Sequence, residues 1–430
     1  MERNPEENRI EGAGATESGT AKAGGVKAGM AGAGTRTRLA WPDWIRGAAI
    51  IAVVSVHLSG VSGFPENPLL LWFNSFAMAV FFFVSGDLMI RGRKPSVGSF
   101  AKHRAAAVLW PFFTFSVLAV FFDYAVLCLN GGQISREMVT VWMRCIFTLV
   151  GKGTLWFLPV FFFGSVLAFA ALAGRNPAKT KAGRETGQSG ETGQSGETGQ
   201  SGETGQSGKT GETGAFTRPC IWEILVFLAG LGAMAFIDRI FAVTVAVVTG
   251  GGDGIASDIF LVVIRSLASA AIILEGAWVG PVFDRIVGTK KGMPAAILCF
   301  AVSLVIPAVY RMDFRTAQFG RFPVLLLISA AAAYGFLRQA AELLEKYSSV
   351  FTYFGRYSLI VMATHLEWYL VNLVWGGVAA VAGQAADFGP GYLARHLAAL
   401  TLVMMIEYPL CGIIDRSFGF LLRLPEKQKP

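Results

Sequence analysis

The sequence has little charge for its length. Only 15% of its 430 residues are charged, whereas 53% are hydrophobic and 12% are aromatic. In soluble globular proteins roughly a quarter of the residues are charged. This shortage of charge excludes an ordinary soluble domain and indicates a chain whose solvent is lipid. The net charge of +8 does not predict a nucleic-acid partner, because the cations cluster in short loops and tails beside hydrophobic runs, where the positive-inside rule accounts for them.

Paired cysteines and a secretory leader are also missing. The five cysteines are scattered and form no C-x-x-C pair, so the sequence predicts neither a disulfide framework nor a metal site. The first 40 residues are mostly small and polar and contain no apolar stretch typical of a cleavable signal peptide. We therefore expect the first membrane helix to serve as its own insertion signal.

What the sequence has in abundance is long apolar segments. A helix needs about 20 predominantly apolar residues to cross a bilayer core, and such segments must satisfy their backbone groups internally. The predicted fold class is therefore all-α, a polytopic membrane helix bundle of about ten transmembrane helices. The predicted spans are 44–62, 69–90, 105–129, 154–173, 221–248, 257–280, 293–310, 322–341, 350–376 and 395–420.

Polar, low-complexity stretches divide the chain around these spans. Residues 185–208 are four copies of ETGQSG, a composition that predicts a flexible linker because it has nothing to bury. The predicted organisation is a disordered cytoplasmic tail (1–40), a first membrane part of four spans (41–174), a disordered cytoplasmic linker (175–216), a second membrane part of six spans (217–422) and a cytoplasmic tail (423–430).

The distribution of basic residues predicts the topology. Ten spans with a cytoplasmic N-terminus put most basic loops and both termini in the cytoplasm, as expected for a multi-pass protein of the plasma membrane. The segment 137–150 carries Arg144 in an apolar run and is interpreted as interfacial or re-entrant, since a further span would invert everything downstream. One basic loop, with Arg311, Arg315 and Arg321, would face outside. It is either a tolerated exception to the rule or a contact with a polar substrate or anionic lipid.

The first span, PDWIRGAAIIAVVSVHLSG, carries the most informative pair of residues. Arg46 and His57 are eleven positions apart, which is about three turns plus 20° on a helix, so both side chains project from one face and lie about 16 Å apart along the axis. An ionisable residue inside a span indicates function, and imidazole titrates where a general base is useful. The alternative for His57 is a core histidine that is hydrogen-bonded for packing.

Five motifs in order carry a resemblance to a known family. Asp43, Arg46, Gly47 and His57 form the first, and SFAMAVFFFVSGDLMIRGR forms the second, with Ser85 and Gly86 followed by Asp87. The others are KHRAAAVLWP (102–111), LWFLP (155–159) and FGRYSLIVMATH (354–365). In these motifs the chain resembles the acyltransferase-3 superfamily of membrane acyltransferases, and most closely its fucose 4-O-acetylase-like branch. Asp87 departs from the pattern, which usually has an aromatic residue there, and this leaves the local packing open.

The resemblance implies roles for individual residues. His57 would be the catalytic base, or a transient acyl carrier, that moves an acyl group from acyl-CoA to a hydroxyl. Arg46 would bind the phosphates of coenzyme A or the donor carbonyl. The further donor- and substrate-binding candidates are Arg91, Arg93, Arg104, Trp156, Glu275 and His365. The alternative for the basic residues is that they only set the membrane topology, and the alternative for Trp156 is that it anchors the chain at the membrane interface. The alternative for His365 is a structural hydrogen bond.

Other polar residues in the spans carry weaker predictions. Asp238 with Arg239, and Asp258 with Arg265, are expected to form internal ion pairs rather than to bind substrate. Glu275 has no local partner in the sequence. His103 and His396 lie at span ends and are assigned no role.

The sequence thus predicts an integral membrane O-acyltransferase. The expected acyl group is acetyl, with acetyl-CoA as a donor substrate, a glycan or glycolipid as the acceptor, membrane lipid as the surroundings, and no bound cofactor. A transporter or flippase for a glycan or a small polar solute is the main alternative, although no internal symmetry of the kind transporters show is visible around the linker. A non-catalytic assembly protein is a third, but it gives no reason for Arg46 and His57 to share a face.

Overall fold

A computed structural model describes residues 39–64, 67–91, 95–174, 219–248, 254–309, 313–315, 317, 319, 322–344, 349–383 and 387–422. The predicted tails and linker lie almost wholly outside these residues, as does Arg93. The side chains of Asp238 and Arg239 are likewise outside the description, so their predicted ion pair stays a prediction.

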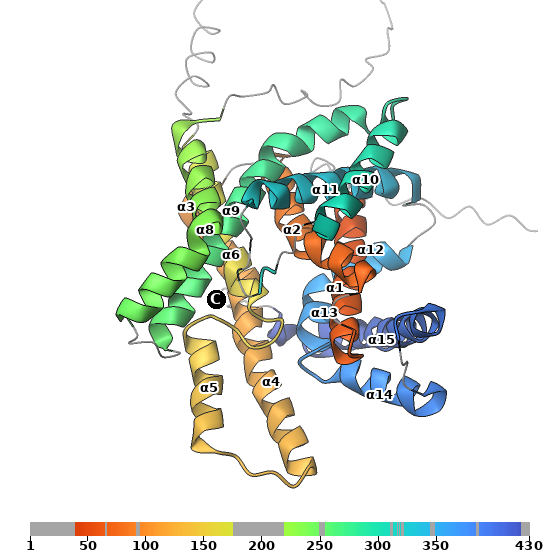
Figure 1. Ribbon diagram of the computed structural model, residues 1–430. Helices are drawn as coiled ribbons and strands as arrows, with labels where there is room; N and C mark the ends of the chain where they lie inside the picture. Colours follow the sequence, from red (N-terminus) through yellow and green to blue (C-terminus); the bar gives the residue numbers. More distant parts are fainter. Residues whose placement is uncertain are drawn as a thin grey trace, which may run out of the picture. The chain divides into compact units, whose positions relative to one another are not determined.

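Every regular element among the described residues is a helix (Figure 1), which confirms the all-α prediction. The elements are α1 (Trp41–Val61), α2 (Pro68–Arg91), α3 (Val97–Arg104), the π-helix η1 (Ala105–Leu109), α4 (Trp110–Leu129), α5 (Arg136–Phe147), α6 (Phe157–Ala173), α8 (Ile221–Val248), α9 (Ile255–Ile286), α10 (Gly292–Val309), α11 (Pro323–Leu344), α12 (Ser349–Arg356), α13 (Ser358–Thr364), α14 (Leu370–Ala382), α15 (Pro390–Ser417) and the 3₁₀ helix η3 (Gly419–Leu421).

Six helical stretches are long and apolar enough to cross a membrane, and four shorter helices are apolar. All ten overlap the predicted spans in order. The segment predicted to be interfacial or re-entrant forms α5, whose 12 residues reach only about 18 Å and cannot cross a hydrocarbon core of about 30 Å.

Helix α1 lies at the centre of the described helices and contacts α2, α11, α12, α13, α14 and α15. Glycines make its closest contact possible. A Cβ on Gly47 would lie 1.8 Å from the backbone oxygen of Phe351, and a Cβ on Gly355 would lie 1.6 Å from that of Asp43. Small residues let helix backbones approach closely in membranes. The glycine of the first motif therefore serves the docking of α12 against α1.

Helices α2 and α9 pack by the same device. Gly86 faces the backbone of Ile273 and Gly276 faces that of Phe83, each too closely for a Cβ. The packing at Asp87, which the sequence left open, is resolved here. Its buried carboxylate accepts hydrogen bonds from Arg91 at 2.7 Å and from the hydroxyl of Tyr334 at 2.6 Å. A carboxylate with charged and hydroxyl donors is stable in this position without an aromatic ring.

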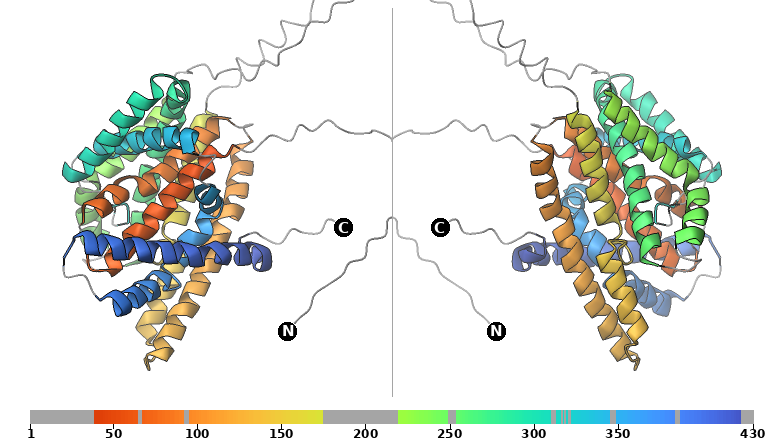
Figure 2. Two further views of the ribbon diagram at one scale, coloured as in Figure 1. Left: turned by 90° about the vertical axis from the view of Figure 1, so that its right-hand side faces the viewer. Right: turned by 90° about the vertical axis from the view of Figure 1, so that its left-hand side faces the viewer.

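The C-terminal helices differ most from the prediction. In both side views α15 crosses α4 at a steep angle (Figure 2). The segment 350–376, predicted as one continuous span, is broken into α12, α13 and the first part of α14. The break before α14 occurs at Tyr369, whose φ is 57°, a left-handed conformation in which a helix cannot continue. The prediction of an unbroken helix here was wrong, because hydropathy does not register backbone conformation.

Candidate functional site

Three interruptions between helices mark the region around His57. They are the segment 148–156 before α6, the described residues 313–315, 317 and 319 before α11, and the segment 365–369 before α14. Among the described residues, the non-glycine residues with positive φ are Leu149, Ala317 and Tyr369, one in each segment. Such conformations cost of order 1–3 kcal/mol and cluster at functional sites. Irregular backbone at membrane depth also requires polar partners within the protein.

The first and third of these segments bind each other. The amide of Thr154 donates to the Glu367 carboxylate at 2.7 Å, and the Thr154 hydroxyl donates to the Met362 carbonyl at 2.6 Å. Lys152 pairs with Glu367 at 3.3 Å and with Asp123 of α4 at 2.8 Å. Burial alone would lower the pKa of Lys152, but these two carboxylates outweigh it and the pKa is raised. The lysine therefore stays charged and ties the two loops together.

The second segment packs against α2 through aromatic rings. Phe314 is buried and lies 5.6 Å from the ring of Phe82, which in turn lies 5.2 Å from Phe157. The next residue, Arg315, lies close enough for its charge to act on His57. Arg315 is the described arginine of the basic loop that the sequence placed outside, and its charge acts on the candidate base.

His57 meets a second histidine across the helix interface. Its Nδ1 lies 3.1 Å from Nε2 of His365 and 3.1 Å from the carbonyl oxygen of Val53. His365 is fully buried, and its own Nδ1 lies 2.5 Å from the carbonyl oxygen of Val361. α13, which carries His365 at its end, is held on α15 because Thr364 donates to the buried carboxylate of Glu407 at 2.8 Å.

These contacts define the protonation pattern of the neutral histidine pair. A carbonyl can only accept, so Nδ1 of His365 carries the hydrogen and its Nε2 carries the lone pair. Nδ1 of His57 then faces two acceptors and must be the donor. The lone pair of His57 is consequently on Nε2, which has no hydrogen-bond partner among the described residues. A histidine fixed in this tautomer presents Nε2 as a base or a nucleophile.

At the other end of the shared face, Arg46 lies near a second arginine. Arg104 donates from Nη2 to the hydroxyls of Ser85 at 2.8 Å and Ser165 at 3.2 Å, and the charge of Arg46 acts on it. No carboxylate pairs with Arg104 within the described ranges, whereas Arg46 lies 3.5 Å from Asp43. A partly buried guanidinium with only neutral partners leaves positive charge available for an anion.

The remaining predicted residues are placed less uniformly. Arg91 is held by Asp87 and by Asp284, so its charge is already balanced. Glu275 is buried in α9, and its Oε2 has no hydrogen-bond partner in the described part of the chain. Trp156 stacks under the guanidinium of Arg265, at 5.0 Å from its ring centroid. The described residues hold no group of three histidine, cysteine, aspartate or glutamate side chains that could bind a metal ion.

The predicted ion pair of Asp258 with Arg265 was wrong. Asp258 instead lies 3.0 Å from Arg144 of α5. The order of the spans along the chain did not indicate this pair. Arg265 is 4% exposed, and its Nε and Nη1 have no hydrogen-bond partner among the described residues. The charges that act on it are first the carboxylate of Asp313, then Arg315, which also acts on His57, and then Asp258. The only indication of function for Arg265 in the sequence was its position inside a predicted span.

A comparison with protein families shows the family of this chain. A family model for an acyltransferase domain matches residues 39–407, from the start of α1 into α15. The chain belongs to the acyltransferase-3 family. It is accordingly a membrane acyltransferase, and all five motifs of the resemblance lie within the matched region. No curated protein and no solved structure matched the chain.

Several motifs of this acyltransferase meet in space. Arg104 from the third motif donates to Ser85 of the second, and Gly355 of the fifth packs against the backbone of Asp43 of the first. His57 of the first motif faces His365 of the fifth at 3.1 Å. The structure thus brings together His57 with His365, and Arg46 with Arg104, whereas Arg91 joins a separate ion-pair network with Asp284.

Proposed function

We propose that this acyltransferase moves an acyl group, foremost acetyl, from acyl-CoA to a hydroxyl of a glycan or glycolipid. The observation that supports this best is the tautomer of His57, whose unprotonated Nε2 is left without a partner. A relation to the fucose 4-O-acetylase-like branch remains part of the proposal and rests on the motifs alone. We further propose a plasma-membrane location with both termini in the cytoplasm, in keeping with the basic residues at the ends of α2 and α9.

The proposed reaction uses Nε2 of His57 as the general base. It takes the proton from the acceptor hydroxyl as that oxygen attacks the thioester carbonyl carbon, so that a C–O bond forms and the C–S bond breaks. The resulting imidazolium returns its proton to the departing coenzyme A thiolate. His365 would hold the His57 ring in place throughout and share the hydrogen on Nδ1.

In the alternative chemistry, Nε2 of His57 attacks the thioester itself and carries the acyl group before the acceptor takes it. Both versions use the same atom. A single-turnover experiment with labelled donor and no acceptor separates them, since only the carrier version places label on the protein.

Arg46 and Arg104 are proposed to bind the phosphates of coenzyme A. Arg104 has neutral partners, and guanidinium groups bind phosphate strongly. The separation of about 16 Å between Arg46 and His57 along α1 suits a donor whose thioester lies far from its nucleotide phosphates. Arg265, on the face of Trp156, and Arg315 are proposed to stabilise the negative charge that develops on the thioester oxygen.

The other predicted residues keep narrower roles in the proposal. Arg91 belongs to the basic region at the end of α2, and its proposed role is to hold this region in place, because Asp87 and Asp284 already bind its charge. Arg93 would extend the same basic region. Glu275 is retained as a substrate contact because its Oε2 lacks a hydrogen-bond partner among the described residues.

Acyl transfer and transport make opposite predictions in one assay. The purified protein in nanodiscs is given radiolabelled acetyl-CoA together with a glycolipid extract of the organism that naturally makes this protein. We expect label to move into the extract and coenzyme A to be released in equal amount. A protein that only moves a solute across a membrane would release no coenzyme A in a nanodisc, and that result would overturn the proposal.

A further inference from the structure

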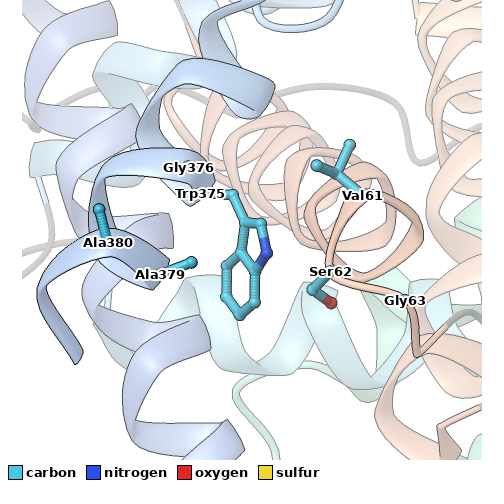
Figure 3. A pocket seen from close by; sticks show the side chains of 7 residues that line it. All are labelled: Val61, Ser62, Gly63, Trp375, Gly376, Ala379 and Ala380. Atoms are coloured by element: carbon cyan, nitrogen blue, oxygen red, sulfur yellow. The ribbon is translucent and has the colours of Figure 1, made fainter. Parts of the chain in front are cut away.

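A cavity of about 510 Å³ opens at the end of α1 that is opposite Arg46 (Figure 3). On one side it is lined by Val61, Ser62 and Gly63, and on the other by Trp375 and the small residues Gly376, Ala379 and Ala380 of α14. Figure 3 shows the indole of Trp375 lying between α14 and the end of α1, with the Ser62 side chain across from it. The volume is in the range of sites for small organic molecules.

The cavity adjoins the face of α1 that carries His57. Val61 follows His57 by four residues, which on a helix is a displacement of about 6 Å along the axis and about 40° around it. A molecule in the cavity therefore lies about one turn beyond His57, whereas Arg46 lies about three turns before it. Two substrates that approach from Arg46 and from this cavity would meet at His57.

A buried hydrogen-bond network fixes the polar wall of the cavity. The Ser62 hydroxyl donates to the carbonyl oxygen of Ser59 at 2.9 Å and lies 3.0 Å from the hydroxyl of Tyr392, which lies 3.2 Å from Nδ1 of His396. Nε2 of His396 lies 2.7 Å from the hydroxyl of Ser55 on α1. His396 is 1% exposed, and it is one of the two histidines to which the sequence assigned no role.

The same tyrosine also holds the aromatic wall. The ring centroid of Tyr392 lies 6.2 Å from that of Trp375. Tyr392 of α15 thus contacts both the Trp375 indole and the Ser62 hydroxyl and holds them in place without a ligand. Preorganised aromatic and polar groups on opposite walls suit a molecule that has an apolar face and polar edges.

A sugar ring has these properties, and a lipid chain does not. A hydrocarbon chain can form no hydrogen bond with the Ser62 hydroxyl on the cavity wall, whereas a sugar hydroxyl can donate one to it. The alanine and glycine residues of α14 leave room beside the indole. They do not provide the bulky apolar lining that a hydrocarbon chain would contact.

We propose that this cavity is the acceptor subsite, in which a sugar ring packs against the exposed 7% of Trp375, donates a hydrogen bond to the Ser62 hydroxyl and directs the reacting hydroxyl along α1 toward His57. This inference rests on the proposed function and adds the location and chemical class of the acceptor. It places donor and acceptor at opposite ends of one helix face.

The first test replaces Trp375 by phenylalanine, leucine and alanine in right-side-out vesicles of the producing cell that enclose radiolabelled acetyl-CoA. We expect alanine and leucine to reduce label transfer to glycan about tenfold, which corresponds to about 1.4 kcal/mol, and phenylalanine to retain most of it. The apparent KM for acetyl-CoA should not change. If leucine supports transfer as well as phenylalanine, the occupant is apolar and the proposal is wrong.

The second test blocks the cavity in a protein whose native cysteines have been replaced. A maleimide coupled to polyethylene glycol is added outside the vesicles to Ala379→Cys, which lines the cavity, and to Val381→Cys, which is 91% exposed on the same helix. We expect transfer to stop in the first protein and to persist in the second. Unimpaired transfer in both would overturn the proposal.

These results are distinguishable from a failure of the proposed function. If vesicles with the wild-type protein transfer no more label than vesicles with His57→Ala, the acyl transfer proposal itself fails. If the wild type transfers label and neither the Trp375 series nor the blocked cysteine alters it, only the acceptor subsite is wrong.

Discussion

Nε2 of His365 lies 3.1 Å from Nδ1 of His57, and this contact joins two motifs that are 308 residues apart in the chain. The carbonyl oxygens behind both rings determine which nitrogens carry hydrogen, and they leave Nε2 of His57 as the lone-pair atom. The contact therefore does more than pack two helices, because it sets which atom of His57 is chemically available.

The role of His365 as a positioning residue can be tested by substitution. His365→Ala should lower kcat about 10- to 100-fold, because the His57 ring loses an acceptor that orients it. The KM for acetyl-CoA should stay unchanged, since His365 does not contact the donor in this account. His365→Gln can accept the same hydrogen bond and should recover part of the activity. Equal activity of the alanine and glutamine variants would argue against orientation through this bond.

Arg104 gives a prediction about the donor. Arg104→Gln should raise the KM for acetyl-CoA about 10- to 100-fold, the effect of losing a hydrogen bond to a charged group. Arg104→Lys should lie between, because it keeps the charge and loses the planar fork. The exposed Arg136 on α5 provides the matched control as Arg136→Gln.

A truncated donor makes the Arg104 measurement specific for phosphate. S-acetylpantetheine lacks the nucleotide and its phosphates, so wild type and Arg104→Gln should have the same KM for it. A variant that is equally impaired with both donors would show that Arg104 acts on the fold or the thioester instead.

Two glycines of α1 predict opposite effects on stability. Gly47→Ala would put a Cβ 1.8 Å from the backbone of Phe351, whereas a Cβ on Gly60 would have nothing within 4 Å. Backbone cannot move aside cheaply, so Gly47→Ala should lose on the order of 3–5 kcal/mol of stability. Gly60→Ala should be neutral or gain up to about 1 kcal/mol from helix propensity. Thermal unfolding in detergent compares the two, and a similar Tm for both variants would contradict the close packing of α1 on α12.

Asp87 predicts a stability effect without a direct effect on chemistry. Asp87→Ala leaves Arg91 and the buried hydroxyl of Tyr334 without this carboxylate, and breaking a buried charge pair costs about 3–5 kcal/mol. Tyr334→Phe removes one hydrogen bond and should cost about 1 kcal/mol. Thermal unfolding measures both, and the order of the two effects should not reverse.

The positions of the spans could be predicted because hydropathy and length determine them. The shared face of Arg46 and His57 followed from helix geometry alone, and the function of the family followed from motifs in order. What hydropathy could not show is where an apolar segment stops being helical. The run 350–376 is mostly apolar, yet its helix breaks before α14 at Tyr369, close to Glu367, which binds Thr154 and Lys152 of a distant segment.

Contacts between distant spans could not be predicted from the sequence either. Asp258 and Arg265 are close in the chain, but Arg144 takes the carboxylate. His396 gave no motif signal, and its network with Tyr392 and Ser55 depends on how α15 crosses α1. These partners are selected by packing in three dimensions, which local spacing does not encode.

Catalysis by His57 can be tested by measuring the transfer of radiolabel from acetyl-CoA in nanodiscs. His57→Ala is compared with wild type and with His103→Ala, a substitution at an exposed histidine. We expect the rate of label transfer to fall by at least about 100-fold in His57→Ala and to change little in His103→Ala. Full acyl transfer by His57→Ala would contradict this role of His57.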